Sequence, residues 1–155
     1  MPNSRSIDHA RLEGVNPPPI CQAILLCDDV TREDATSKTT VSGIFDTFYV
    51  PSFPGTTVPC KVFLRLTGVV GKCNLVAEIQ DPVQGVVLLR SPHSAELAAE
   101  AEQTKGEIAL PVSPLPFARP GTYELVVFAD RIEVARVQFD VKTVGVLSHV
   151  SGQHA

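Results

Sequence analysis

The sequence predicts an all-β fold, a single antiparallel sandwich of about seven to eight short strands. Apolar and polar residues alternate with a period of two in several segments, most clearly in residues 60–67, which is typical of a strand with one buried face. Turn-forming Gly, Pro, Asn and Asp separate these segments at short intervals. The chain has 155 residues, enough for one domain with a self-sufficient hydrophobic core.

An arm, a domain and a tail are predicted along the chain. Residues 1–19 are polar and end in Asn-Pro-Pro-Pro, which favours a flexible N-terminal arm because proline removes amide donors. The sandwich domain spans residues 20–142. Residues 143–155 lose the alternation, so we expect a flexible C-terminal tail.

The first half of the domain is predicted to contain two strands joined by a long loop. Residues 20–27 are a compact apolar run of strand length, and residues 28–38 are polar and predict the loop. Residues 39–50 are dense in β-branched and aromatic side chains and predict the second strand, with a bulge at Gly43. Residues 51–59 then form an irregular loop rich in proline.

Two alternating segments follow. Residues 60–67 and 73–80 are each predicted to be half-buried strands, and the glycines in residues 68–71 predict a hairpin between them. Residues 86–90 continue as another apolar strand. The predicted core consists of apolar residues in the inward phase of the alternating strands, namely Val62, Leu64, Leu66, Leu75, Ile79, Leu125 and Val127.

The stretch 92–105 fits two patterns. Ser91 and Pro92 suit the start of a helix, residues 95–103 are rich in helix formers, and Gly106 suits its end. The alternation of Ala and Leu with Glu in the same stretch also fits an exposed edge strand or an extended loop. One short helix near residues 92–105 is therefore one expectation, and an extended segment is the other.

A closing hairpin is predicted near the end of the domain. Residues 108–112 form a short strand, and prolines lead from it to two strands at residues 123–129 and 132–142. In the last strand the apolar phase changes after Val134, which predicts a bulge.

The cysteines predict core positions rather than chemistry. Cys21, Cys27, Cys60 and Cys73 occupy the apolar phase of predicted strands, and Cys27 shares a face with Cys21 if the first strand is regular. Their spacing matches neither paired zinc knuckles nor a thioredoxin motif. We expect free, buried thiols that react slowly until the chain unfolds.

Several short motifs point to one family. The sequence contains Leu26-Cys27-Asp28, a later Lys38, Gly43-Ile44-Phe45-Asp46 and Phe53-Pro54. With these motifs the chain resembles an uncharacterised bacterial family of single β-sandwich domains of unknown function, over most of residues 20–142. The later Pro120-Gly121-x-Tyr123 and Phe139-x-Val141 are similar to the closing hairpin of many immunoglobulin-like modules. The predicted fold is accordingly an immunoglobulin-like or C2-like sandwich, and the resemblance implies no catalytic residue, substrate or cofactor.

Charge and hydropathy exclude several classes of partner. The chain has 13 Lys and Arg against 17 Asp and Glu, a net charge of −4, so it lacks the basic field that nucleic acids and anionic membrane surfaces require. Its apolar runs are too short for a signal peptide or a membrane span. We therefore expect a cytoplasmic protein that binds neither nucleic acid nor membrane.

The sequence lacks the common enzyme motifs. The sequence has neither a G-x-S-x-G nucleophile elbow nor a phosphate-binding glycine motif between a strand and a helix. Its histidines, His9, His93, His149 and His154, lie in the predicted arm, a loop edge and the tail. The expectation is a protein without enzymatic activity and without a cofactor.

The polar loop is the candidate interaction or calcium loop. It carries Asp28, Asp29, Glu33 and Asp34 and ends at Lys38. Loops of C2-like domains hold calcium with such carboxylates, although this spacing is not that of an EF-hand. The alternative is that these residues cap turns and keep the loop soluble.

The function that fits these observations best is a non-enzymatic interaction or accessory module. Such a module would present loops or an exposed sheet edge to a protein partner, with residues 28–38 or 51–59 in the binding surface. A C2-like calcium-binding module is the first alternative. An enzyme whose site carries no recognisable motif is the second.

Overall fold

The computed structural model describes residues 18–68, 72–96, 105–112 and 114–144. Within these ranges the chain forms twelve strands and is all-β, as predicted. The strands are β1 (Ile20–Cys27), β2 (Asp29–Arg32), β3 (Thr39–Ser42), β4 (Thr47–Val50), β5 (Gly55–Thr56), β6 (Cys60–Thr67), β7 (Lys72–Asp81), β8 (Val86–Glu96), β9 (Lys105–Val112), β10 (Pro116–Phe117), β11 (Gly121–Ala129) and β12 (Ile132–Thr143). The predicted arm and tail lie outside the described residues, except for residues 18–19 and 143–144.

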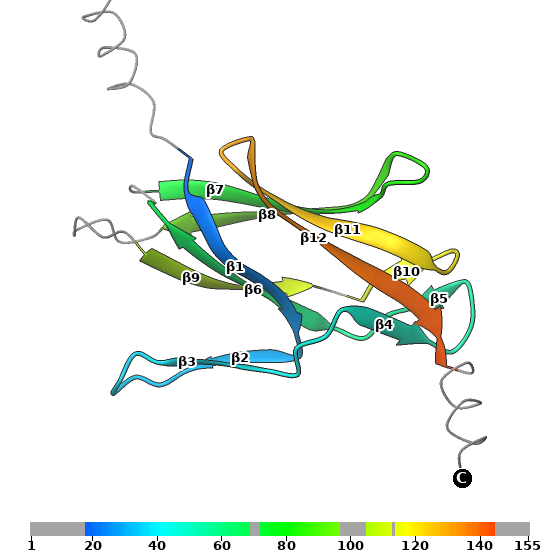
Figure 1. The fold of residues 1–155 in the computed structure, drawn as a ribbon, viewed down its shortest axis with the longest axis horizontal. Helices are drawn as coiled ribbons and strands as arrows, with labels where there is room; N and C mark the ends of the chain where they lie inside the picture. Colours follow the sequence, from blue (N-terminus) through cyan, green and yellow to red (C-terminus); the bar gives the residue numbers. More distant parts are fainter. Residues whose placement is uncertain (1–17, 69–71, 97–104, 113, 145–155) are drawn as a thin grey trace, which may run out of the picture.

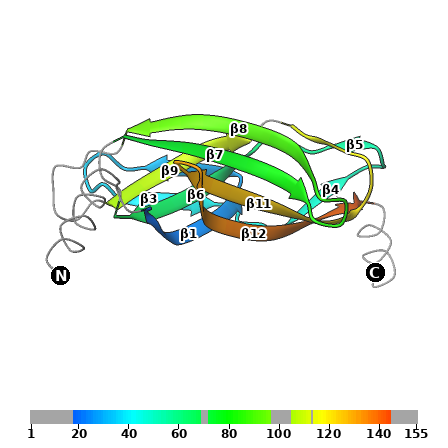
Figure 2. The ribbon, with the colours of Figure 1, turned by 90° about the horizontal axis from the view of Figure 1, so that it is seen from above.

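Two sheets form the body of the domain (Figure 1). One has the order β1-β6-β9, and the other has the order β4-β12-β11-β7-β8. All pairings in them are antiparallel except that of β4 with β12, which is parallel. The view from above shows β8 along one outer edge of the larger sheet (Figure 2).

This strand order is that of an immunoglobulin-like sandwich. The strands β1, β6 and β9 correspond to A, B and E of that fold, and β8, β7, β11 and β12 to C′, C, F and G. The Tyr123 hydroxyl, near the start of β11, donates a hydrogen bond to the carbonyl oxygen of Arg119 at 2.6 Å. This is the tyrosine corner of such domains, and it explains the Pro-Gly-x-Tyr motif at the entry to the closing hairpin.

The core lies between the two sheets. All seven predicted core residues are no more than 2% exposed, which confirms that the alternating segments are strands with one buried face. Four aromatic rings fill one end of the core with edge-to-face and stacked contacts, from Phe48, Phe117, Tyr123 and Phe139.

One predicted pairing is wrong. β6 and β7 do not form a hairpin, because β6 pairs with β1 and β9 while β7 pairs with β8 and β11 in the other sheet. Alternation shows that a strand faces a core, but both sheets of a sandwich face the same core. The connection between β6 and β7 therefore crosses from one sheet to the other.

The helix considered near residues 92–105 is not formed where the structure describes the chain. β8 continues through Glu96, and Lys105 already begins β9, while residues 97–104 lie outside the described residues. Pairing with β7 from Lys72 to Asp81 extends β8 beyond the predicted end at Arg90. Backbone hydrogen bonds to a long neighbouring strand override the local helix preference here.

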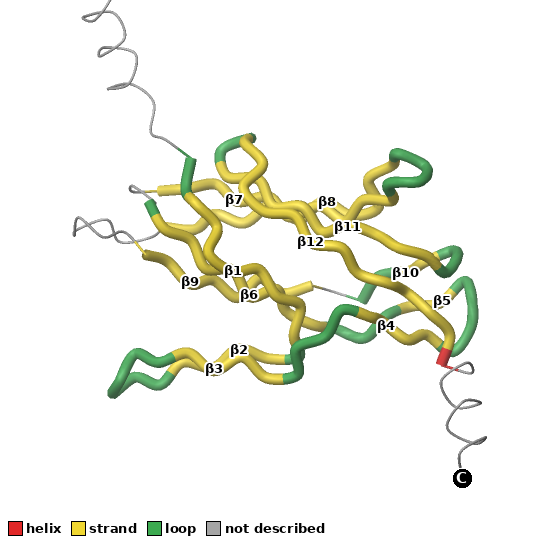
Figure 3. Tube along the Cα trace, viewed as in Figure 1, coloured by secondary structure: helices red, strands yellow, loops and turns green. Residues whose placement is uncertain are grey.

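The predicted long loop and second strand are also arranged differently. Residues 29–32 are β2, which pairs with β3, so the loop and the start of the next strand together form a hairpin. The strand expected at residues 39–50 is split at Gly43, which has a φ of +68°. Its second part, β4, joins the five-stranded sheet (Figure 3).

The β2–β3 hairpin lies along the outer face of the smaller sheet. Asp29 contacts Lys61 in β6, and the Thr39 hydroxyl donates to Glu107 in β9. By register, Lys61 and Glu107 are on the side of β6 and β9 that points away from the core. The hairpin therefore adds a partial third layer to the sandwich.

Bulges decide which face the cysteines occupy. The predicted bulge in the last strand is confirmed at Val134, where Val127 pairs with Ala135 and the next residue pairs with Glu133. A second bulge at Gln22 in β1 puts Cys21 on the core face and Cys27 on the outer face, so the expectation that they share a face is wrong. Cys27 is nevertheless completely buried.

All four cysteines are free, as predicted. Cys27, Cys60 and Cys73 are buried, and Cys21 is partly buried. Burial raises the pKa of the Cys60 thiol to about 11, with smaller contributions from the neighbouring Cys27 and Asp28. The thiols are therefore packing groups rather than activated nucleophiles.

Candidate functional site

The motif residues meet at the corner where β1 gives way to the hairpin. The backbone N–H of Asp28 donates to the carbonyl oxygens of Ser42 and Gly43, at 3.0 and 3.1 Å. The N–H of Phe45 donates to the carbonyl oxygen of Leu26 at 3.0 Å. These backbone hydrogen bonds fasten the open end of the hairpin to the last residues of β1.

Gly43 is required at this corner by space as well as by backbone conformation. A Cβ atom at this position would lie 2.1 Å from Oδ2 of Asp28 and 2.8 Å from its Cβ. The Asp28 side chain therefore packs directly on the glycine. This contact gives a structural reason for the Cys-Asp and Gly-Ile-Phe-Asp motifs, which lie far apart in the sequence.

The candidate loop residues are spread over the hairpin. Oδ1 of Asp29 accepts a hydrogen bond from Nζ of Lys61 at 2.7 Å, and this bond lowers the pKa of Asp29. Glu33, Asp34 and Lys38 lie exposed on the turn, closed by hydrogen bonds from Glu33 N–H to Lys38 O and from Ser37 N–H to Glu33 O. Asp28 is held at the opposite end of the hairpin, against Gly43.

The described residues contain no group of three or more His, Cys, Asp or Glu side chains placed to hold a metal ion. Calcium needs about six to eight oxygen ligands at one point. The hairpin instead distributes its carboxylates between the corner, an ion pair and the turn. Glu33 and Asp34 lie exposed on that turn.

The second predicted loop, residues 51–59, is fastened to the chain that leads into β11. Its short strand β5 pairs with β10, and Phe53-Pro54 is a cis peptide. The buried Thr57 donates its N–H to the carbonyl oxygen of Leu115 and accepts the N–H of Leu115 on its hydroxyl, at 3.0 and 3.1 Å. These bonds leave Val58, the next residue, 69% exposed.

The two predicted loops each contribute one residue, Asp28 and Val58, to the lining of an apolar hollow. This hollow has a volume of about 420 Å³ and is lined by Asp28, Gly43, Ile44, Phe45, Thr47, Phe48, Tyr49 and Val58. A second hollow of about 280 Å³ lies on the other side of Ile44 and Phe45, against β1 and β12. Ile44 is 59% exposed and Tyr49 is 44% exposed. We call Ile44, Tyr49 and Val58 the Ile44 patch.

The Ile44 patch is not among the sites predicted from the sequence. Nearly every residue from 39 to 50 is apolar, aromatic or β-branched, so composition cannot show which of them face the core. The structure buries Phe48 and Val50 and exposes Ile44 and Tyr49. The residues of β4 alternate in burial, but Phe48, Tyr49 and Val50 are all apolar or aromatic, so the polarity pattern of the sequence does not show this alternation.

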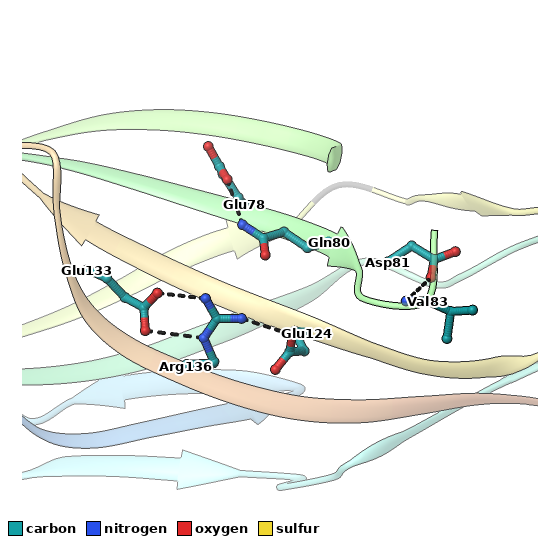
Figure 4. A network of polar contacts seen from close by, with 7 residues as sticks. All are labelled: Glu78, Gln80, Asp81, Val83, Glu124, Glu133 and Arg136. Atoms are coloured by element: carbon teal, nitrogen blue, oxygen red, sulfur yellow. Dashed lines mark hydrogen bonds and ion pairs between the residues drawn. The ribbon is translucent and has the colours of Figure 1, made fainter. Parts of the chain in front are cut away.

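The outer face of the five-stranded sheet carries a network of paired charges (Figure 4). Arg136 donates to Glu124 at 2.9 Å and to both carboxylate oxygens of Glu133 at 2.6 and 3.2 Å. Beside it, the Gln80 amide donates to Glu78 at 2.9 Å. The hydrogen bond from Arg136 lowers the pKa of Glu133. Each charged side chain drawn in Figure 4 has a hydrogen-bond partner, so none of them is a free acid or base for catalysis.

Fold and corner together define an immunoglobulin-like β-sandwich domain with an added hairpin. The chain belongs to a family of unknown function, DUF6941, whose model matches residues 22–142. This match confirms the resemblance to an uncharacterised domain family that the motifs indicated. No curated protein matches the chain.

Two solved structures are similar to this chain at low identity. An immunoglobulin-like protein from Pseudomonas aeruginosa has a TM-score of 0.42 and 15% identity, covering 83% of this chain and 99% of its own. The alkylpurine DNA glycosylase AlkC of Pseudomonas fluorescens, bound to DNA with an abasic site analogue, has a TM-score of 0.37 and 8% identity. That similarity covers 77% of this chain and 30% of the glycosylase.

The described part of the chain also lacks any helix with the length and hydropathy of a membrane-spanning segment.

Proposed function

We propose that this domain is a non-enzymatic interaction module of the cytoplasm that binds a protein partner through the Ile44 patch. One observation carries the proposal: three exposed apolar side chains, from β4 and from the segments before and after it, surround a hollow at the corner of the sandwich. Contiguous exposed apolar surface on a folded domain commonly marks an interaction site. Val58 lies in the predicted binding loop 51–59, and the other predicted loop, residues 28–38, reaches the hollow through Asp28.

The electrostatics of the domain support a non-enzymatic role. Of the carboxylates with a lowered pKa, Asp29 and Glu133 each accept a hydrogen bond from a cationic partner, Lys61 and Arg136. A nucleophilic cysteine requires a lowered pKa, whereas burial raises the pKa of the Cys27 and Cys73 thiols. These shifts are those of structural pairs and packed thiols.

The shape of the patch favours an apolar side chain of a partner. Ile44 stands between two hollows, so a partner that covers it would reach both. Tyr49 adds an aromatic ring, a residue type that is enriched in protein interfaces. Asp28 and Thr47, which also line the hollow, are polar and fit the rim of such an interface.

A site-specific photo-crosslinker tests the proposal in cells. We expect a crosslinker in place of Tyr49 to trap a defined protein, and one in place of Val83 to trap none. Val83 is the matched control because it is apolar and 79% exposed but lies in the β7–β8 turn. Equal crosslinking from both positions would contradict the proposal.

A substitution pair then tests the patch itself. Ile44→Asp places a charge between the hollows and should abolish the Tyr49 crosslink. Ile132→Asp is its control, because Ile132 is 46% exposed in the β11–β12 hairpin, away from the hollows. A crosslink that survives Ile44→Asp shows that the partner binds elsewhere.

A further inference from the structure

A polar hollow lies between the β2–β3 hairpin and the outer face of the smaller sheet. It has a volume of about 460 Å³ and is lined by Arg32, Ser37, Lys38, Thr39, Arg65 and Glu107. The hairpin supplies four of these residues, and β6 and β9 supply the other two. The hollow does not share a lining residue with the Ile44 patch, so it is a separate feature of the molecule.

The charges that line this hollow are unbalanced. Three cationic side chains face one carboxylate, that of Glu107. Glu107 is already engaged at both oxygens, because Oε1 accepts the Thr39 hydroxyl and Oε2 lies 3.8 Å from Nη1 of Arg65. Within the described part of the chain, Arg32 and Lys38 form no ion pair. The lining therefore carries two uncompensated positive charges.

Arg65 adds an independent observation. Its Nε atom is buried and has no hydrogen-bond partner among the described residues, although its side chain is 43% exposed. A buried, unpartnered N–H on a cation is unfavourable, and a contact of 3.8 Å with Glu107 is too long for a hydrogen bond. Glu107 is thus a weak partner for Arg65, and the exposed end of the guanidinium remains available to an anion that enters the hollow.

We infer that this hollow binds a phosphate group, as free phosphate or as a phosphate monoester. Arginine and lysine donors from three positions match the several acceptor oxygens of phosphate, and the Ser37 hydroxyl is a further donor on the lining. The net charge of −4 disfavours anions at long range, but screening over about 8 Å at physiological salt leaves the local cations dominant.

Titration of the full-length chain with inorganic phosphate, and separately with glycerol 3-phosphate, tests the inference at constant ionic strength. We expect saturable amide chemical-shift changes confined to the lining residues. Similar affinity for both probes identifies the phosphate group itself as the ligand, and tighter binding of glycerol 3-phosphate identifies a monoester. Absence of saturable shifts with both probes overturns the inference.

A charge-matched pair of double variants makes the test specific. Arg32→Gln with Lys38→Gln should weaken phosphate binding about tenfold or more, because two charge-assisted contacts are lost. Arg131→Gln with Lys142→Gln removes the same charge at exposed positions outside the hollow and should change affinity less than about twofold. Equal weakening in both double variants would show general charge attraction and would overturn the site. Unchanged unfolding midpoints verify that both double variants are folded.

Discussion

Leu64 shows how much of the stability rests on single side chains in this thin sandwich. It is completely buried and packs with Leu66, Leu75 and Val127, which come from both sheets. Each of these side chains fills part of the space between the two sheets, where side chains from both inner faces interdigitate at close to crystal packing density. A cavity at Leu64 would therefore collapse only in part.

The first prediction follows from this packing. Leu64→Ala should lower the free energy of unfolding by about 2 to 5 kcal/mol, through lost burial and the cavity that remains. Leu88→Ala is the matched control, since Leu88 is 44% exposed in β8, and its effect should be well under half as large. Urea denaturation measures both. Similar losses for the two variants would contradict the assignment of Leu64 to the core.

The second prediction concerns the thiols. A bulky disulfide reagent at pH 8 should modify the partly exposed Cys21 first and Cys60 last. Burial raises the pKa of Cys60 to about 11, so its reactive thiolate is about a thousandth of the total at that pH. Mass spectrometry of quenched peptides gives the order. If Cys60 in the folded protein were labelled as fast as Cys21, the start of β6 would be accessible to the reagent, which would contradict the prediction.

At the scale of elements, the corner between β1 and the hairpin depends on one glycine. Gly43 and Gly85 have the same φ of +68°, but the space around them differs. A Cβ at Gly43 would overlap the Asp28 side chain, whereas a Cβ at Gly85 meets nothing within 4 Å. The two glycines therefore separate the cost of backbone conformation from the cost of overlap.

The third prediction uses this pair. Gly85→Ala should cost about 1 to 2 kcal/mol for the left-handed conformation alone. Gly43→Ala should cost about 1 to 3 kcal/mol more, because Asp28 must move. Thermal or urea unfolding of the two variants gives the difference. If both variants lose the same stability, the Asp28 side chain is not packed on the glycine.

Residues 60–67 and 73–80 show what could be predicted from the sequence at this scale. Alternation located β6 and β7, their buried faces and the five core residues predicted in them correctly. It also revealed the bulge at Val134, because a bulge changes the phase of apolar residues. Each of these features depends on side chains within one strand, which a sequence displays directly.

Features that depend on distant partners could not be predicted in the same way. The pairing of β6 with β9 instead of β7 depends on sheet choice, which local alternation does not encode. The end of β8 enters a stretch rich in helix formers, and pairing with β7 keeps the backbone in strand conformation there. The Ile44 patch and the polar hollow each combine residues from separate segments, so only the folded chain brings them together.

At the scale of the whole molecule, Asp81 links the end of one strand to the entry of another. One carboxylate oxygen accepts the N–H groups of Val83 and Gln84 at 3.0 and 3.2 Å and caps the turn into β8. The other accepts a hydrogen bond from Arg119, whose carbonyl oxygen accepts the Tyr123 hydroxyl. This chain of contacts ties the β7–β8 turn to the tyrosine corner.

The last prediction follows from the charge of this link. Burial raises the pKa of Asp81, but hydrogen bonds from Gln84 and Arg119 outweigh it and lower the pKa overall. Because the pKa of Asp81 is lower in the folded state, its carboxylate stabilises the fold at pH values above the unfolded-state pKa of about 3.9. This contribution is lost as the pH falls through the folded-state pKa. Asp81→Asn should therefore be less stable than wild type at pH 7, and this difference in stability should narrow below about pH 4.

Asp34→Asn, on the exposed hairpin turn, is the control and should change stability by less than about 0.5 kcal/mol at pH 7. Urea denaturation from pH 3 to 7 measures the gap, and a gap that stays constant or widens in acid would show that the Asp81 carboxylate does not stabilise the fold through its charge.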